Sequence, residues 1–394
     1  MNYRRFGKTE LKMPMISSGS MRFQTSWQRE DTVKSESIAN LEKIVAHALE
    51  LGINHFETAW GYGTSEEELG HVLPHYNRSD LIVQTKVIPK GGSKETFLAD
   101  LDAGMKALNM DYLDLLGIHG INNDGILKDC LKKGGILDTC LDLKKKGVIR
   151  HLGFSTHAAT QTIIDTIETG LFDYVNMWYS YVYPFNWSAI QHARAHDMGV
   201  FIISPNDKGG MLYSPSDKLA RLCAPLNPMT FNDIFILMNE EIHTISCGVK
   251  VAQDYDLHVD AVARLDTLKG KVTTIAAQLD QEMTRIVDAQ WPRTYLHGIP
   301  EWNAVPGQMN VQGMLWLWSL LKALDLEEYA KFRYNLLGVS EHWFPGENAK
   351  NVAEVNQDAL RDAFKNSPYT DRVMDILHNI DDQLKAEEGQ RLGG

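Results

Sequence analysis

The sequence predicts an α/β fold, a parallel (β/α)8 TIM barrel with a β-hairpin before it and a mostly helical extension after it. Short apolar runs alternate with longer stretches whose apolar residues have helical spacing, and eight such repeats occur before residue 268. Of the 394 residues, 44% are apolar, which is enough for one large core and a further part. We therefore expect the barrel over residues 1–268 and a helical extension packed on it over residues 269–394.

The expected elements follow the chain in a regular order. The first is a hairpin over Tyr3–Met13, which would close the bottom of the barrel. Eight strands are expected at Pro14–Gly19, Asn54–Glu57, Leu81–Thr85, Leu113–Gly117, His151–Phe154, Tyr174–Met177, Val200–Ser204 and His243–Ser246. Helices are expected between them at Ser35–Leu51, Lys94–Leu108, Leu127–Lys146, Ala158–Thr169 and Trp187–Asp197. Four of these helices are expected to be capped by glycines, Gly52, Gly147, Gly170 and Gly199.

Helical spacing continues in the extension. Helices are expected at Val272–Gln290, Met314–Ala323 and Glu327–Leu336, with a turn-rich stretch over Trp291–Gly307. The second of these helices carries Trp316 and Trp318, which we expect to pack against the barrel or against a partner subunit in a homo-oligomer.

Net charge and cysteine spacing narrow the class of protein. A net charge of -12 disfavours nucleic acid or an anionic membrane as the main partner, because either would require a basic surface. No run of about 18 apolar residues and no apolar signal core are present, so we expect a cytoplasmic protein that spans no membrane. The cysteines lack C-x-x-C spacing, which indicates reduced side chains rather than a disulfide scaffold or a thiolate metal site: Cys130, Cys140, Cys223 and Cys247.

Four polar side chains occur at or just after the ends of three successive strands. Glu57 ends the second expected strand, Tyr62 lies in the loop after it, Lys86 ends the third and His119 follows the fourth. In a (β/α)8 barrel the functional side chains gather at the carboxyl ends of the strands. The four should therefore meet at one mouth, where they could form a proton-transfer site.

The segment from Glu57 to Gly70 resembles the signature of the aldo-keto reductase family. That signature reads aspartate-threonine-alanine, two residues, tyrosine-glycine, then serine-glutamate and a glycine, and here only Glu57 departs from it. The resemblance implies a barrel enzyme that reduces carbonyl compounds with a nicotinamide cofactor. Tyr62 would donate the proton, Lys86 would stabilise its phenolate, Glu57 would hold Lys86, and His119 would hydrogen-bond the substrate oxygen.

The same resemblance implies a set of cofactor contacts at the remaining strand ends. Ser155 and Asn176 would hold the nicotinamide amide, Lys208 and Gly209 belong to the pyrophosphate loop, and a loop after the eighth strand would take the adenosine phosphate. The full set is Met21, Ser155, Asn176, Ser204, Lys208, Gly209, Gly248, Lys250 and Asp254. Lys250 favours NADP(H) over NAD(H), with NAD(H) still possible. Neither a G-x-G-x-x-G nor a G-x-x-x-x-G-K-[ST] site is present.

Metals and clusters are not expected. His192 and His196 lie one helical turn apart but lack the glutamate of H-E-x-x-H. The extension is similar to tails of bacterial relatives that carry ferredoxin-like cysteines, around Val305–Val311 and His342–Gly346, but the cysteines are absent. We therefore expect no iron-sulfur cluster.

The expected substrate is an aldehyde, a ketone or a sugar carbonyl or hydroxyl. Trp27, Trp60 and Trp178 lie in or near loops at the strand ends and could stack on sugar rings or line an apolar site. A carbohydrate is preferred, and the direction of reaction is open. Two alternatives stay open: a slow or non-catalytic nicotinamide-binding redox sensor subunit, and a sugar epimerase or lyase that recycles its bound cofactor.

Overall fold

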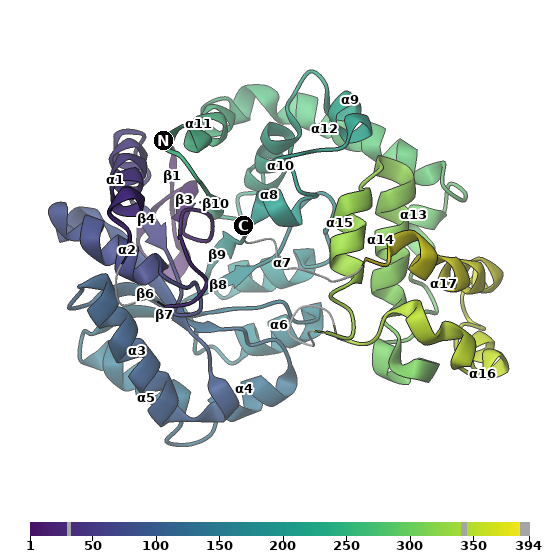
Figure 1. Ribbon diagram of the computed structural model, residues 1–394, viewed down its shortest axis with the longest axis horizontal. Coiled ribbons are helices and arrows are strands. Elements are labelled where there is room, and N and C mark those ends of the chain that lie inside the picture. The colour runs from purple at the N-terminus through teal and green to yellow at the C-terminus, as the bar shows by residue number, and fades with distance from the viewer. Residues whose placement is uncertain (30–32, 340–344, 387–394) are drawn as a thin grey trace. The chain divides into compact units, whose positions relative to one another are not determined.

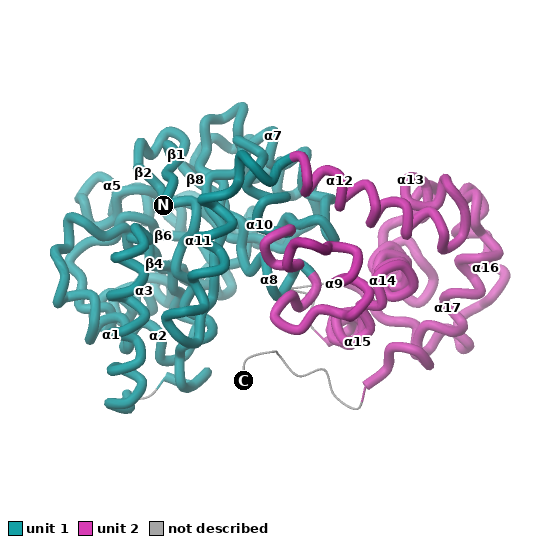
Figure 2. Tube along the Cα trace, turned by 90° about the horizontal axis from the view of Figure 1, so that it is seen from above, with its two compact units in different colours: residues 1–209, 232–269, 393–394 teal, residues 210–231, 270–392 magenta. Residues whose placement is uncertain are grey.

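The computed structural model describes residues 1–29, 33–339 and 345–386, which form two compact units (Figure 2). One unit contains residues 1–209 and 232–269, and the other contains residues 210–231 and the described residues from 270 onward. The predicted division into a barrel over residues 1–268 and a helical extension packed on it over residues 269–394 stays a prediction.

The first unit is built around a barrel of strands (Figure 1). The barrel is closed and has eight parallel strands in the order β10-β3-β4-β5-β6-β7-β8-β9. The prediction of a (β/α)8 barrel is confirmed, and each expected strand overlaps an observed one. The strands are β3 (Ile16–Gly19), β4 (His55–Glu57), β5 (Ile82–Val87), β6 (Leu113–His119), β7 (Ile149–Ser155), β8 (Tyr174–Met177), β9 (Gly199–Ile202) and β10 (Thr244–Gly248).

An amino-terminal hairpin precedes the barrel, as predicted. Its strands β1 (Tyr3–Arg5) and β2 (Lys12–Pro14) pair antiparallel. Phe6 and Met13 are fully buried and pack with side chains from four barrel strands: Ile82, Leu115, Tyr174 and Phe201. Three of those four residues lie in the first half of their strands, so the hairpin closes the amino-terminal end of the barrel.

Helices surround the strands (Figure 1). The main core consists of side chains from both layers. The core-facing residues of α1 are Leu41, Ile44, Val45 and Ala48, which follow the helical repeat. The helices of this unit are α1 (Ser35–Glu50), α2 (Ser65–Val72), α3 (Lys94–Leu108), α4 (Asp124–Cys130), α5 (Ile136–Lys145), α6 (Thr160–Glu168), α7 (Trp187–Ala195), α8 (Pro205–Lys208) and α11 (Asp256–Ala263). Of the three boundaries between the units in the described chain, one follows α8, and the other two fall inside α10 (Pro228–Leu237) and α12 (Leu265–Thr284).

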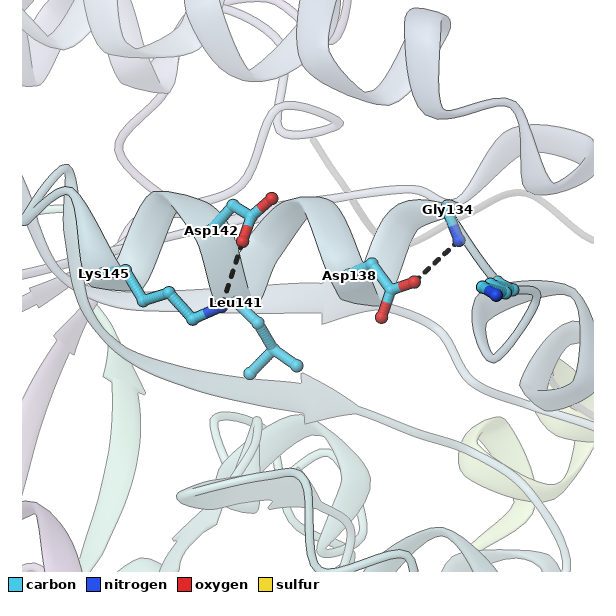
Figure 3. Close-up of a pocket in the computed structure, with 6 residues that line it drawn as sticks. Gly134, Asp138, Leu141, Asp142 and Lys145 are labelled. Atoms are coloured by element: carbon cyan, nitrogen blue, oxygen red, sulfur yellow. Dashed lines mark hydrogen bonds and ion pairs between the residues drawn. The ribbon is translucent and has the colours of Figure 1, made fainter.

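The expectation of one helix over Leu127–Lys146 is wrong, because the segment forms two helices, α4 and α5. Gly134 has a φ of +71°, which a continuous helix cannot contain. The Asp138 carboxylate accepts a hydrogen bond from the Gly134 N–H at 2.6 Å and so fixes the break (Figure 3). A surface pocket lies beside this turn and contains none of the predicted site residues; it is lined by Lys133, Gly134, Asp138, Leu141, Asp142 and Lys145.

Three of the four predicted glycine caps have the expected positive φ: Gly52, Gly147 and Gly170. Gly199 is an exception, because it is the first residue of β9, and Asp197 takes the left-handed conformation instead, with a φ of +50°. A Cβ on Gly199 would lie 2.7 Å from the Phe6 ring. Gly199 is therefore needed for close packing against the hairpin rather than for a helix cap.

The second unit is helical. Its buried Trp291 donates a hydrogen bond to the Ser319 hydroxyl at 2.9 Å and contacts the ring of Trp318. Trp316 packs edge-on against Tyr329, so both tryptophans of α14 have partners within this unit. Its helices are α9 (Asp217–Cys223), α13 (Trp291–Thr294), α14 (Val311–Leu324), α15 (Glu327–Tyr334), α16 (Gln357–Ala363) and α17 (Thr370–Leu384).

Of the segment His342–Gly346, compared above with cysteine-bearing tails, residues 342–344 lie outside the described residues. Within the described ranges, no helix combines the length and the apolar character needed to cross a membrane.

Candidate active site

Four side chains from three neighbouring strand ends meet at the carboxyl end of the barrel. Glu57 is the last residue of β4, Lys86 lies near the end of β5, His119 ends β6, and Tyr62 lies in the loop after β4. Lys86 Nζ is ion-paired with a Glu57 carboxylate oxygen and lies 3.4 Å from the Tyr62 hydroxyl oxygen. The Tyr62 and His119 rings meet edge to face, with centroids 5.6 Å apart. The structure thus brings together all four residues that the sequence singles out.

Lys86 is a buried cation with only 1% of its surface exposed. Its ammonium also donates a hydrogen bond to the Thr58 carbonyl oxygen at 2.8 Å. Burial favours the neutral amine, but the charge of Glu57 and the contact with Tyr62 outweigh this effect and raise the pKa of Lys86. Lys86 is therefore charged at neutral pH, beside the phenol.

Backbone contacts fix the loop that carries Tyr62. The N–H of Thr58 bonds to the Gln84 carbonyl at 2.8 Å, and the N–H of Trp60 bonds to the Lys86 carbonyl at 2.9 Å, so β5 supports the start of the loop. Gly63 has a φ of +55°, and a Cβ at this position would overlap the carbonyl oxygen of Ser26. The glycine that follows the tyrosine in the signature is therefore needed for a close approach between two loops.

Glu57 has a second partner that sequence reasoning missed. The Ser246 hydroxyl, on β10, donates a hydrogen bond to Glu57 Oε1 at 3.0 Å, while Oε2 faces Lys86. The sequence held no signal for this contact, because a serine in an apolar strand is common and the partner is 189 residues away. Only the order of strands in the closed barrel brings the two residues near each other.

Two candidate nicotinamide contacts are paired neighbours. Ser155 and Asn176 lie opposite each other in the β7–β8 register. Asn176 is fully buried, and neither its amide nitrogen nor its amide oxygen has a hydrogen-bond partner among the residues that the structure describes. A buried side-chain amide that lacks both partners fits a ligand that presents an amide of its own.

The candidate pyrophosphate loop follows β9. Ser204 has a φ of +48° and precedes the short helix α8, which ends with Lys208 and is followed by Gly209. Lys208 is 4% exposed, and its Nζ lies 3.2 Å from His157 Nε2. Met21, two residues after β3, is half-buried.

The candidate adenosine-phosphate loop follows β10. Gly248 ends this strand and Lys250 is exposed. The Asp254 carboxylate accepts hydrogen bonds from the N–H groups of Lys250, at 2.7 Å, and Val251, at 3.3 Å. This side chain therefore occupies the N–H groups at which an anion would be expected to bind.

The three candidate substrate tryptophans differ in their surroundings. Trp60 is covered by the Arg29 guanidinium, which lies 3.5 Å from its ring centroid and pairs with the buried Glu66 at 2.8 Å. Trp178 is 4% exposed and stacks on Tyr183 with centroids 3.8 Å apart. Trp27 is half-buried in the loop that Gly63 contacts. Trp60 and Trp178 are thus held by ring contacts, and sequence reasoning missed Arg29.

Two sequence relatives are partial matches. The chain is 30% identical over 139 residues to the L-glyceraldehyde 3-phosphate reductase of Escherichia coli strain K12, and this match covers 32% of this chain and 38% of that protein. It is 30% identical over 138 residues to an aldo-keto reductase of Mycolicibacterium smegmatis, and this match covers 34% of this chain and 48% of that protein. The matches span less than half the length of these curated relatives.

A solved structure supports the fold. The holo form of an aldo-keto reductase from Bacillus halodurans superimposes with a TM-score of 0.57 and 21% identity, covering 69% of this chain and 96% of that one. In sequence, the model of the aldo/keto reductase family matches residues 15–276, which is more than half of the chain and contains every candidate site residue. The chain therefore belongs to the aldo/keto reductase family.

Proposed function

We propose that the protein is an oxidoreductase that transfers a hydride between a nicotinamide cofactor and the carbonyl carbon of a small molecule, with Tyr62 exchanging the proton at the oxygen. The contact that carries this proposal is the one between Lys86 Nζ and the Tyr62 hydroxyl, 3.4 Å apart. A phenol is a weak acid, and a fixed positive charge stabilises the phenolate that remains when its proton leaves. Glu57 keeps the cation in place.

His119 supports the same chemistry. Its ring meets the Tyr62 ring edge to face, so an imidazole N–H near the phenol can hydrogen-bond a substrate oxygen. Two donors at one oxygen polarise the carbonyl and stabilise the charge that develops on it. Tyr62 would then complete the reaction by giving up its proton.

The nicotinamide cofactor, when bound, supplies or accepts the hydride. Asn176 supports its placement, because the side chain can both donate to and accept from an amide, and Ser155 lies beside it. The Ser155 hydroxyl accepts a hydrogen bond from the Gly120 N–H at 3.1 Å, which leaves its proton to donate. These two residues would orient the ring over the mouth of the barrel.

The choice between NADP(H) and NAD(H) stays a prediction at this site. Lys250 favours NADP(H), because a cation stabilises a 2′-phosphate. Asp254 has the opposite effect, because its carboxylate repels a phosphate and already accepts the hydrogen bonds of two N–H groups. Binding measurements with both cofactors decide between these two influences.

The proposed substrate is an aldehyde, a ketone or a sugar carbonyl, with a carbohydrate preferred. The matched reductase of Escherichia coli is named for a phosphorylated three-carbon aldehyde, which supports a small polar carbonyl compound. Aromatic rings such as Trp27, Trp60 and Trp178 offer apolar faces for the C–H face of a sugar. Their number near the strand ends supports this class.

Tyr62→Phe tests the proposal, because it removes one hydroxyl and keeps the ring. Turnover of NADH and NADPH over a panel of aldehydes, ketones and sugars should fall at least a hundredfold, while cofactor affinity, measured by fluorescence, stays within about threefold. Tyr76→Phe is the matched control, since Tyr76 precedes β5 and so lies toward the amino-terminal end of the barrel. Unchanged turnover in Tyr62→Phe would remove Tyr62 from the mechanism.

A further inference from the structure

Two side chains contact the Glu57 carboxylate, and one of them, Ser246, lies on β10, which is not a neighbour of β4 in the barrel. Ser246 on β10 donates to Oε1 at 3.0 Å, and Lys86 on β5 pairs with Oε2. The exposed fractions of the three side chains are 5% for Ser246, 3% for Glu57 and 1% for Lys86. Bulk water therefore has little access to either oxygen, and the two protein contacts orient the carboxylate.

Strand β3 lies between β10 and β4, and the hydrogen bond passes over it. Gly248, Gly19 and Glu57 are aligned across these three strands. A Cβ on Gly19 would overlap the hydroxyl oxygen of Ser246. The absence of a side chain at Gly19 thus leaves the space through which Ser246 reaches Glu57.

One layer deeper, the same three strands are connected in a different way. There the middle residue has a side chain: the Ser17 hydroxyl lies 2.7 Å from Thr244 Oγ1 and 2.6 Å from His55 Nδ1. In the deeper layer the Ser17 hydroxyl of β3 contacts side chains of both β10 and β4. In the layer of Gly19, β3 has no side chain, and Ser246 of β10 contacts Glu57 of β4 directly. The contact between Ser246 and Glu57 is therefore specific to the upper layer, where the candidate catalytic groups lie.

We propose that Ser246 is a positioning residue that acts through Glu57, and that Gly19 is required to let it do so. A glutamate side chain has one more rotatable bond than an aspartate, so a single contact with Lys86 leaves it more freedom. The second contact removes that freedom and aims the carboxylate at Lys86, which in turn faces the Tyr62 hydroxyl. This inference rests on the proposed function, because it concerns how that site is organised.

Five of the titratable groups that the structure describes belong to the site around Glu57 or interact with its charges. Lys86, Tyr62 and His119 belong to the site itself. Burial and the charge of Lys86 lower the pKa of His55 to about 3, and burial raises the pKa of Tyr174 well above its usual value. Neither of these two changes charge between pH 6 and pH 10, so a change in pH profile in this range reports on the site.

Ser246→Ala should lower kcat about tenfold or more and leave KM within about twofold, because small displacements of catalytic groups reduce rates strongly. The alkaline limit of the reductive reaction should also move to higher pH, because a less firmly held Lys86 stabilises the phenolate less. Ser18→Ala is the matched control: Ser18 is a buried serine of β3 that accepts a hydrogen bond from Tyr255 at 2.6 Å. Its kcat and pH profile should stay unchanged.

Gly19→Ala completes the experiment by displacing the Ser246 hydroxyl without altering Ser246. Gly19→Ala, Ser246→Ala and the double variant should show similar losses of kcat, because all three remove the same hydrogen bond, and the double variant should melt above Gly19→Ala because the overlap is relieved. The inference is overturned if the kcat losses of the two single variants multiply in the double variant, or if Ser246→Ala keeps the wild-type kcat and pH profile. Either result would leave the proposed function standing. A wild type that reduces no carbonyl compound would overturn the proposed function as well.

Discussion

Lys86→Met is expected to remove most of the activity by removing the cation beside the Tyr62 hydroxyl. Two unit charges 3.4 Å apart interact by about 5 kcal/mol at an effective dielectric constant of about 20. The Glu57 carboxylate on the other side of Lys86 offsets part of this field. We therefore expect kcat to fall about a hundred- to a thousandfold, which corresponds to about 3 to 4 kcal/mol.

The assay must separate this loss from a loss of folding. Lys86→Met leaves the carboxylate of Glu57 buried without its cation, which should cost about 3–5 kcal/mol of stability. Turnover, near-ultraviolet circular dichroism and thermal unfolding are therefore also measured for Glu57→Gln/Lys86→Met, which should regain stability but not activity. Lys90→Met is the control, since this lysine is half exposed and pairs with Asp100. A folded Lys86→Met protein with kcat within threefold of wild type would refute the reasoning.

Three further predictions concern stability and cofactor choice. The pKa of Lys86 is raised in the folded state, so the ion pair with Glu57 contributes its full stabilisation below about pH 10.4, and this stabilisation is lost as the pH rises further. The unfolding temperature of the wild type should therefore fall more steeply from pH 10 to pH 11.5 than that of Glu57→Gln/Lys86→Met. Asp254→Asn should tighten NADPH binding about tenfold and leave NADH binding within twofold, as titration of cofactor fluorescence would show. Gly70→Ala should destabilise the protein by about 2 kcal/mol or more, because the new Cβ would overlap the carbonyl oxygen of Ala107. The unfolding temperature of the control Gly61→Ala should change little, since the atom nearest to its Cβ is 3.7 Å away.

The order and type of the barrel elements could be predicted because they depend on local spacing. Each expected strand overlaps an observed one, and α3 has the predicted bounds, Lys94–Leu108. The error at Leu127–Lys146 arose because apolar spacing continues on both sides of the turn at Gly134. A glycine inside a helical pattern can be tolerated or can end the helix, and the contact with Asp138 decides for the second outcome.

The candidate site could be predicted as far as it follows from strand ends. Parallel strands place their carboxyl ends at one side of the barrel, so Glu57, Lys86 and His119 had to lie near one another once the fold was known. The role of Asp254 could not be predicted in the same way. Its position suggested a contact with the cofactor, whereas in the structure its carboxylate accepts hydrogen bonds from the neighbouring backbone.

By itself, the sequence determined the barrel, the family and the four polar residues at the mouth, because periodicity and a short contiguous motif carry that information. Only the tertiary structure decided how the departure from the family signature is accommodated. Ser246 reaches Glu57 across Gly19 because the barrel closes with β10 beside β3, which joins residues from opposite ends of the barrel sequence. Closure and strand register are properties of the whole fold, and no local pattern encodes them.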